Sequence, residues 1–281
     1  MKTGVQQIML GSITGKQKEA LQTLKEIKAL GYDGIELNGF MIHPTSFFIR
    51  MLTKLAGMPT GEGGKNDWHA LIQESGLEVI SLHTDLGSLK RDLNQVAQEA
   101  KSFGTKFVVI TGMHRFDYTS MEALKSLCED LNACGEALQK EGLTLCYHNH
   151  NVEFQRLENG QTAFSYLLQH TNPEFVFFEF DSYWAAEAGV NVYKLLAGLK
   201  GRVKLHHIND RGSKAKGPFM TPILESDSME LGTGNMDLEE LIRLDKEIGV
   251  EAIVLETHRN FLDHSPMTSI RKSREYLEAH L

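Results

Sequence analysis

The sequence has few cysteines and prolines and no low-complexity segment. Its 281 residues include only three cysteines, Cys128, Cys134 and Cys146, and none of them forms a CxxC pair. This pattern predicts neither a disulfide framework nor a cysteine zinc site, and it favours a reducing cytoplasm as the location. The six prolines are too few for a proline-rich linker, so we expect a globular chain throughout.

The sequence also lacks signals for a membrane or a nucleic acid. No stretch reaches the apolar length that a membrane span requires, and residues 1–11 lack the apolar region and small-residue cleavage site of a signal peptide. The formal net charge is -8, whereas binding to phosphate backbones is driven largely by Lys and Arg. We therefore expect no membrane and no nucleic-acid partner. A small molecule is the expected partner, and self-association into a homo-oligomer stays open.

A glycine followed by an apolar run recurs along the chain. It occurs six times after an amphipathic stretch, which predicts a left-handed residue at the end of a helix in each case: Gly31, Gly76, Gly104, Gly142, Gly201 and Gly249. Residues 7–10 and 175–180 are apolar runs that we interpret as two further strands without this glycine. Eight strands alternating with helices predict an α/β fold, a single (β/α)₈ TIM barrel over residues 1–281. An open doubly wound sheet is the alternative.

Individual helices carry local signals. Leu21, Leu24, Ile27 and Leu30 share one side of residues 16–30, while Lys18, Gln22 and Lys25 face outward. Asp237 precedes a helix and stands three residues before Glu240, which resembles a capping box. These signals support the helical layer that a barrel requires.

Two segments are too long for plain connections between a strand and a helix. Residues 40–66, rich in glycine, are expected to form an inserted loop and short helix after the second strand. Residues 211–230 are expected to form a polar loop after the seventh. Loops that follow barrel strands build the active site, so we expect both segments to lie over the catalytic face as lids.

Polar residues stand where nearly every predicted strand ends, and these ends meet at the mouth of a barrel. They are Glu36, His83, His114, His148, His150, Glu153, Asp181, His206, His207, Asp210 and Glu256. A lone histidine is more often structural. Two histidines and two carboxylates from four strands, however, form a mixed nitrogen and oxygen set suited to Mn²⁺, Co²⁺, Fe²⁺ or Zn²⁺.

Five motifs carry a family resemblance that runs nearly end to end. They are Tyr147-His-Asn-His150, Phe180-Asp181-Ser-Tyr-Trp184, Leu205-His-His207-Ile-Asn-Asp210, Glu230-Leu-Gly-Thr-Gly234 and Val254-Leu-Glu256-Thr. With them the sequence resembles the xylose-isomerase-like superfamily of sugar-phosphate isomerases and epimerases. The resemblance implies one divalent ion, Mn²⁺ first with Co²⁺, Zn²⁺, Fe²⁺ or Mg²⁺ as alternatives. It implies as metal ligands His148, Asp181, His207 and Glu256.

Two positions depart from the family pattern. His148 stands where epimerases of the family usually have a glutamate that pairs with the one on the eighth strand, which puts symmetric two-glutamate epimerisation in doubt. Trp184 stands where several relatives have a substrate-binding histidine, and an indole there suits stacking on a sugar. We expect Glu256 and Glu153 to be the catalytic acid and base residues, with His83 as another option for the second base.

The remaining polar residues have substrate and structural interpretations. We expect substrate contacts from Glu36, His83, His150, Trp184 and Arg211. Glu36 and Arg211 could instead close a salt bridge at the rim, and His150 could orient a ligand. His206 should point opposite His207 and be structural, because neighbouring residues of a strand face opposite sides.

These residues predict a divalent-metal-dependent isomerase or epimerase that acts on a small keto-sugar or sugar phosphate through an enediolate-type intermediate. Elimination by a dehydratase or lyase, on a keto-inositol or 3-keto-glycoside, is the alternative. DNA repair of the AP-endonuclease type is disfavoured because the chain is acidic and lacks the Asp-x-His pair expected after the seventh strand. A binding subunit without activity is the remaining hypothesis.

Overall fold

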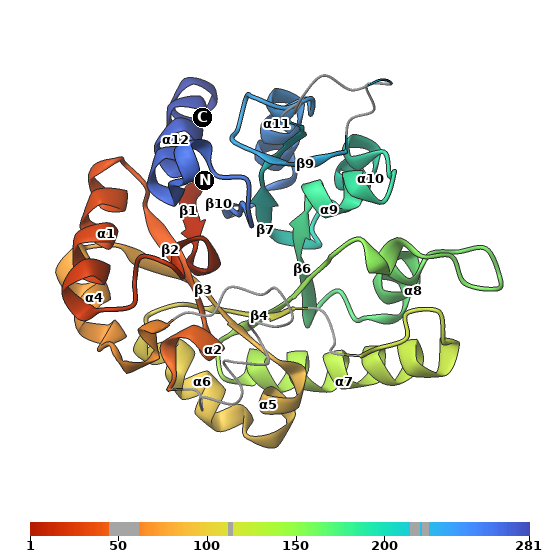
Figure 1. Cartoon of the computed structure of the whole chain (residues 1–281). Coiled ribbons are helices and arrows are strands. Elements are labelled where there is room, and N and C mark those ends of the chain that lie inside the picture. Colours follow the sequence, from red (N-terminus) through yellow and green to blue (C-terminus); the bar gives the residue numbers. More distant parts are fainter. Residues whose placement is uncertain (45–61, 112–114, 214–219, 221–224) are drawn as a thin grey trace.

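The computed structural model describes residues 1–44, 62–111, 115–213, 220 and 225–281. Eight parallel strands close into a barrel in the order β1-β10-β7-β6-β5-β4-β3-β2 (Figure 1). The strands are β1 (Lys2–Gln6), β2 (Gly34–Asn38), β3 (Glu78–Thr84), β4 (Phe107–Thr111), β5 (Thr144–His148), β6 (Val176–Asp181), β7 (Val203–Ile208) and β10 (Ala252–Leu255). The predicted TIM barrel is confirmed, and the open-sheet alternative is excluded.

Helices surround the barrel, with short helices at several strand ends (Figure 1). The α-helices are α1 (Gln17–Ala29), α2 (Gly39–Ile42), α4 (Trp68–Ser75), α5 (Leu86–Arg91), α6 (Leu93–Ser102), α7 (Met121–Lys140), α8 (Ala163–His170), α9 (Ser182–Glu187), α10 (Val192–Gly198), α11 (Leu238–Ile248) and α12 (Pro266–His280). The 3₁₀ turns are η1 (Gln7–Leu10), η2 (Glu62–Lys65), η3 (Val152–Phe154) and η4 (Leu262–His264). Among the described helices, none is both long and apolar enough to cross a membrane.

The glycine signal is confirmed at all six positions, where φ lies between +73° and +93°. Gly76 ends α4 and Gly249 ends α11 in the left-handed conformation, and each amide donates to a carbonyl of the last helical turn. A side chain at such a φ is strained, so glycine ends these helices at little cost. Asp237 caps α11 by accepting the Glu240 amide at 3.0 Å, as the capping-box pattern predicts.

The prediction of a strand over residues 7–10 is wrong. Strand β1 occupies Lys2–Gln6, and Gln7–Leu10 forms the 3₁₀ turn η1. The side chain of Gln6 accepts the Ile8 amide at 2.8 Å, and the side chain of Gln7 accepts the Asn38 amide at 2.7 Å. Met9 and Leu10 are buried in the turn, which explains why apolar character alone suggested a strand.

The barrel interior has an apolar floor below a polar layer. A compact apolar cluster fills the interior: Ile80, Phe107, Val109, Cys146, Leu205, Ala252 and Val254. Side chains two residues apart on a strand share one face, so His148 lies beyond Cys146, His207 beyond Leu205 and Glu256 beyond Val254. The polar residues therefore gather at the carboxyl ends of the strands, and the apolar cluster fills the barrel interior beneath them.

The two long segments both leave the carboxyl end of a strand. The first begins with α2 after β2 and reaches η2, and the second begins with β8 (Asp210–Gly212) after β7. Strand β8 pairs antiparallel with β9 (Asp227–Met229), so the base of this segment is a two-stranded ribbon and not a plain loop. Residues 45–61, 214–219 and 221–224 lie outside the described residues, and so does His114. The role of both segments as lids stays a prediction.

Candidate metal centre

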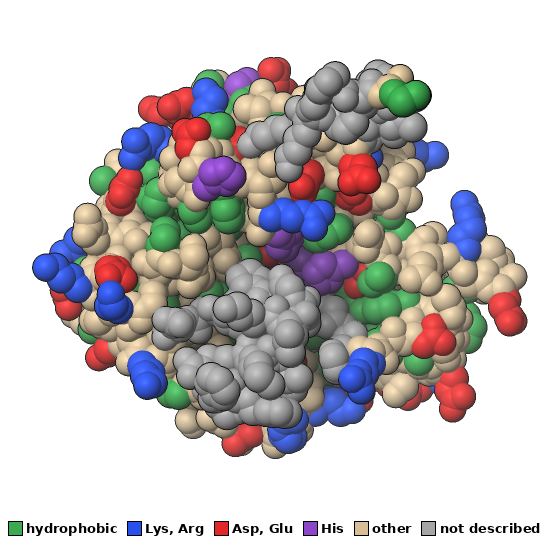
Figure 2. Space-filling view, in the orientation of Figure 1, with side chains coloured by type: hydrophobic (Ala, Val, Ile, Leu, Met, Phe, Trp, Pro, Cys, Tyr) green, Lys and Arg blue, Asp and Glu red, His purple; other side chains and the backbone are tan. Residues whose placement is uncertain are grey.

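The structure brings the four expected metal ligands together at the mouth of the barrel. His148 ends β5, Asp181 ends β6, His207 lies in β7, and Glu256 directly follows β10. One potential ligand atom from each lies within 4.8 Å of the others, and the four side chains are buried. Histidines are visible at the centre of the face in Figure 2.

Unpaired polar atoms in this group fit a divalent ion. Asp181 uses one oxygen to cap α9, accepting the Trp184 amide at 2.8 Å, while its Oδ2 is buried without a hydrogen-bond partner among the described residues. The Nδ1 atom of His148 is also buried without a hydrogen bond among the described residues, and it lies 3.2 Å from Glu179 Oε2. An unpaired buried polar group is costly, so these atoms suit a site that a cation completes. The nitrogen and oxygen donors are those that Zn²⁺ or Mn²⁺ accept.

The charges in the group differ from residue to residue. Burial would raise the pKa of Glu256, but His258 and His207 hold it well below its usual range, so this carboxylate is ionised. Burial and the charge of His207 lower the pKa of His148, which keeps its imidazole neutral. Burial and the neighbouring Glu256 raise the pKa of Asp181. One ionised carboxylate thus faces a neutral imidazole, the form of histidine that binds metals.

Glu36 lies inside the barrel and not at the rim, and its role toward a substrate stays a prediction. Its side chain is fully buried, and its Oε1 accepts the Ser81 hydroxyl at 2.7 Å. Its Oε2 lies 2.5 Å from His207 Nε2 and 3.2 Å from His83 Nε2. The reason is that β2 continues to Asn38, which leaves Glu36 below the end of the strand.

Sequence reasoning missed Glu179, which faces the same interior. It is fully buried, and its Oε2 lies 3.1 Å from His83 Nε2 and 3.2 Å from His207 Nε2. Burial, together with the charge of Glu36, raises its pKa to about 7. The alternation that separated His206 from His207 could have found it, because Glu179 stands two residues before Asp181 on the same face of β6.

Trp184, His150 and His258 form an aromatic border to the centre. The Trp184 ring centroid lies 5.8 Å from that of His150 and 5.5 Å from that of His258. His258, two residues after Glu256, was also missed by the sequence analysis, and its Nε2 lies 3.6 Å from Glu256 Oε2. His150 packs against His148 and His258 lies beside Glu256, so the border adjoins the ligand set with aromatic surfaces suited to a sugar ring.

Glu153 and Arg211 are engaged with protein groups. Glu153 is fully buried, accepts the Tyr147 hydroxyl at 2.8 Å through Oε1 and accepts the His150 amide at 3.0 Å through Oε2. Burial raises its pKa. Arg211 pairs with Glu187 of α9 at 2.5 Å. The catalytic role of Glu153 and the substrate role of Arg211 stay predictions.

Comparison with known proteins agrees with the fold. Residues 24–280 match the family model described as "Xylose isomerase-like TIM barrel". The chain belongs to the xylose isomerase-like family.

Individual relatives in this family are distant. Inosose dehydratase of Salmonella typhimurium is 27% identical over 163 residues, which are 54% of this chain and 52% of that protein, so the chain spans about half the length of this curated relative. A sugar phosphate isomerase/epimerase from Parabacteroides distasonis has a TM-score of 0.77 at 20% identity, covering 99% of this chain and 93% of that one. The IOLI protein, solved with a zinc atom, has a TM-score of 0.69 at 16% identity, covering 99% and 97%. At such identities these two structures show the fold alone.

In this member of the xylose isomerase-like family, Asp210 has a structural role. Its carboxylate accepts the amides of Gly232 at 3.1 Å, Gly234 at 2.8 Å and Met236 at 3.1 Å. A Cβ on Gly234 would lie 2.4 Å from Asp210 Oδ1, so the motif after β9 needs glycine for this close approach. His206 likewise binds Asp245 of α11 at 2.6 Å, on the side opposite His207, as the alternation predicts.

A cleft adjoins the centre at His258. It has a volume of about 850 Å³ and is lined by Asp227 and residues 258–264. Asn260, Asp263 and His264 have positive φ values of 63°, 52° and 56°. Residues held in this uncommon conformation often cluster at ligand sites, and the volume lies in the range of small-molecule pockets.

Proposed function

We propose that this chain is a divalent-metal-dependent lyase of the dehydratase type that acts on a small keto-cyclitol or keto-glycoside. The observation that carries the proposal is the make-up of the ligand set, in which Glu256 is the only glutamate and β5 ends in an imidazole, that of His148. Proton transfer on both faces of a substrate needs two such groups, whereas elimination needs one base beside the carbonyl and a way for an oxygen substituent to leave.

The metal site would be held by His148, Asp181, His207 and Glu256, whose donor atoms lie within 4.8 Å of one another. A divalent ion bound there stabilises negative charge that develops on a neighbouring substrate oxygen. Glu256 would accept the proton next to the carbonyl, because its carboxylate is ionised and lies in the ligand set. Trp184 and His258 would hold the ring, and the cleft of about 850 Å³ would accept the rest of the substrate.

A curated relative supports elimination as the outcome. The Salmonella protein that matches this chain is named inosose dehydratase, and that name describes loss of water from a keto-inositol. The match covers about half of each chain, so the substrate remains part of the proposal. Elimination requires no second glutamate on β5, where this chain has His148.

An isomerase or epimerase on a keto-sugar or its phosphate is the second candidate. His258 lies 3.6 Å from Glu256 and His150 borders the same space, so a second proton carrier is present near the ligand set. With a histidine as that carrier, the proton would return to carbon without loss of an oxygen substituent.

Proton NMR in deuterated water separates the two candidates. Purified protein loaded with Mn²⁺ for the reaction would be incubated with inososes, 3-keto-glycosides, keto-sugars and keto-sugar phosphates, and freed of Mn²⁺ before spectra are recorded. Loss of water or of the glycosidic group supports the lyase. Deuterium incorporation with an intact carbon and oxygen framework selects the isomerase or epimerase. Absence of both outcomes with every substrate class would reject the proposal.

A further inference from the structure

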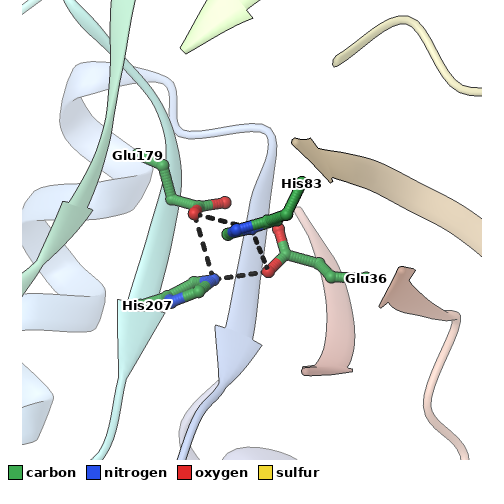
Figure 3. Close-up of side chains that lie close together, drawn as sticks. All are labelled: Glu36, His83, Glu179 and His207. Carbon is green, nitrogen blue, oxygen red and sulfur yellow. Dashed lines mark hydrogen bonds and ion pairs between the residues drawn. The ribbon is translucent and has the colours of Figure 1, made fainter. Parts of the chain in front are cut away.

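Four side chains form a closed ring inside the barrel, below the ligand set just described (Figure 3). The ring consists of Glu36, His83, Glu179 and His207, which come from β2, β3, β6 and β7. Glu179 stands two residues before Asp181 on β6, so its side chain faces the same side of the strand one layer deeper in the barrel. His207 belongs to both groups.

The distances around the ring suit a single small cation. One atom of each side chain faces the centre, and the edges measure 3.2 Å from Glu36 to His83, 3.1 Å from His83 to Glu179, 3.2 Å from Glu179 to His207 and 2.5 Å from His207 to Glu36. Bonds of about 2.1 Å to one ion separate neighbouring ligand atoms by roughly 3.0 Å in a square and about 3.4 Å in a tetrahedron. Three edges lie in that range. The fourth, from His207 to Glu36, would have to lengthen by roughly 0.5 Å for an ion to bind.

An unpaired side chain points into the ring. Glu179 is fully buried, and neither of its oxygens has a well-directed hydrogen bond among the described residues. The other three side chains form hydrogen bonds to residues outside the ring. Ser81 binds Glu36, Thr111 binds His83 Nδ1, and Glu256 binds His207 Nδ1. Such outer contacts orient the ligands of metal sites.

The two nitrogens of His207 face different groups. Its Nδ1 lies 2.9 Å from Glu256 of the outer ligand set, whereas its Nε2 lies 3.2 Å from Glu179 of the ring. One imidazole can therefore contact both sites without turning.

We propose that the ring of Glu36, His83, Glu179 and His207 is a second divalent-cation site, joined to the outer site through the two nitrogens of His207. Two carboxylates and two imidazoles suit Zn²⁺, Mn²⁺, Fe²⁺ or Co²⁺. The inference goes beyond the proposed function, which needs only the outer ion. Its competitor is a ring that holds protons, because two protonated imidazoles would balance two carboxylates and exclude a cation.

Metal stoichiometry tests the proposal directly. Metal-free protein would be dialysed against Zn²⁺ with a weak chelator that keeps surface sites empty, and zinc would be counted by mass spectrometry. We expect two ions per chain in the wild type and one in Glu179→Gln. Asp181→Asn, which weakens the outer site, should keep the inner ion. Wild-type protein loaded with Mn²⁺ should give an electron paramagnetic resonance spectrum of two coupled ions, and Glu179→Gln should give that of an isolated ion.

Asp245→Asn is the matched control, since Asp245 is also a buried carboxylate paired with a histidine but lies in α11, outside the barrel interior. It should bind two ions.

Circular dichroism would check each variant for folding, and Glu36→Gln replaces Glu179→Gln if that variant does not fold. One ion in the wild type, retained in Glu179→Gln and lost in Asp181→Asn, overturns the inference and leaves the proposed function intact. Two ions in both wild type and Glu179→Gln overturn it as well, and no ion in any form contradicts both proposals.

Discussion

Replacing Glu179 with Gln should change how the stability of the metal-free protein depends on pH. The raised pKa of Glu179, about 7 compared with 4.5 for an ordinary glutamate, means that the folded state resists ionising this carboxyl. At pH 5 and below the Glu179 carboxyl is protonated in the folded protein, so its raised pKa lowers the free energy of unfolding only slightly. As the pH rises from about 4.5 to 7, the unfolded chain releases this proton while the folded protein retains it, so stability is lost across this window and the loss levels off above pH 7. Gln keeps the shape and cannot ionise.

The size of the effect follows from the same values. Each pKa unit corresponds to about 1.4 kcal/mol, so full ionisation costs roughly 3 kcal/mol at pH 8 and above. The group is fully buried, so the value is not reduced for solvent screening. It is an upper limit, because Gln also removes the carboxylate that raises the pKa of His83 and His207. At roughly 2 °C per kcal/mol for a chain of this size, Glu179→Gln should melt up to about 6 °C above the wild type at pH 8.

Thermal melts from pH 5 to pH 9 in the presence of a strong chelator would measure the difference between variant and wild type. The difference should be small at pH 5 and grow to its full value by pH 8. Glu158→Gln, which changes an exposed carboxylate, is the control and should follow the wild type throughout. Parallel curves for Glu179→Gln and wild type, or a variant that melts lower at pH 8, would refute the reasoning.

Three further predictions concern activity and folding. Glu256→Gln should abolish turnover and weaken metal binding, because it removes the ionised carboxylate beside His207; full activity on any substrate found would exclude Glu256 as the base. If Glu153 carries a proton, Glu153→Gln should keep its metal while turnover falls roughly a hundredfold or more, whereas full turnover would assign Glu153 to holding the Tyr147 and His150 contacts. Gly234→Ala should destabilise the fold by roughly 1–3 kcal/mol in urea unfolding, because its Cβ would lie 2.4 Å from the Arg211 carbonyl oxygen. Gly198→Ala, with nothing within 4 Å, is the control, and equal stability of both variants would contradict the clash.

The barrel could be predicted from the sequence because it depends on local periodicity, whereas the four residues proposed as outer ligands were suggested by the family motifs. The six glycines mark helix ends through their backbone conformation alone, and all six adopt positive φ. The alternation of strand residues sends His207 inward and His206 toward Asp245. The residues that end strands must meet in a parallel barrel, which is why His148, Asp181, His207 and Glu256 converge.

The inner ring could not be found in this way. Alternation gives the face of a residue but not its depth, and depth decided that Glu36 lies below the rim. Apolar character likewise did not distinguish the strand expected at residues 7–10 from the 3₁₀ turn that Gln6 caps. Glu36 and His207 are separated by 171 positions in the sequence and lie 2.5 Å apart in the structure. The sequence determined which side chains face inward, while closure of the barrel decided which of them touch, because only closure sets the register of strands that are not neighbours in the sequence.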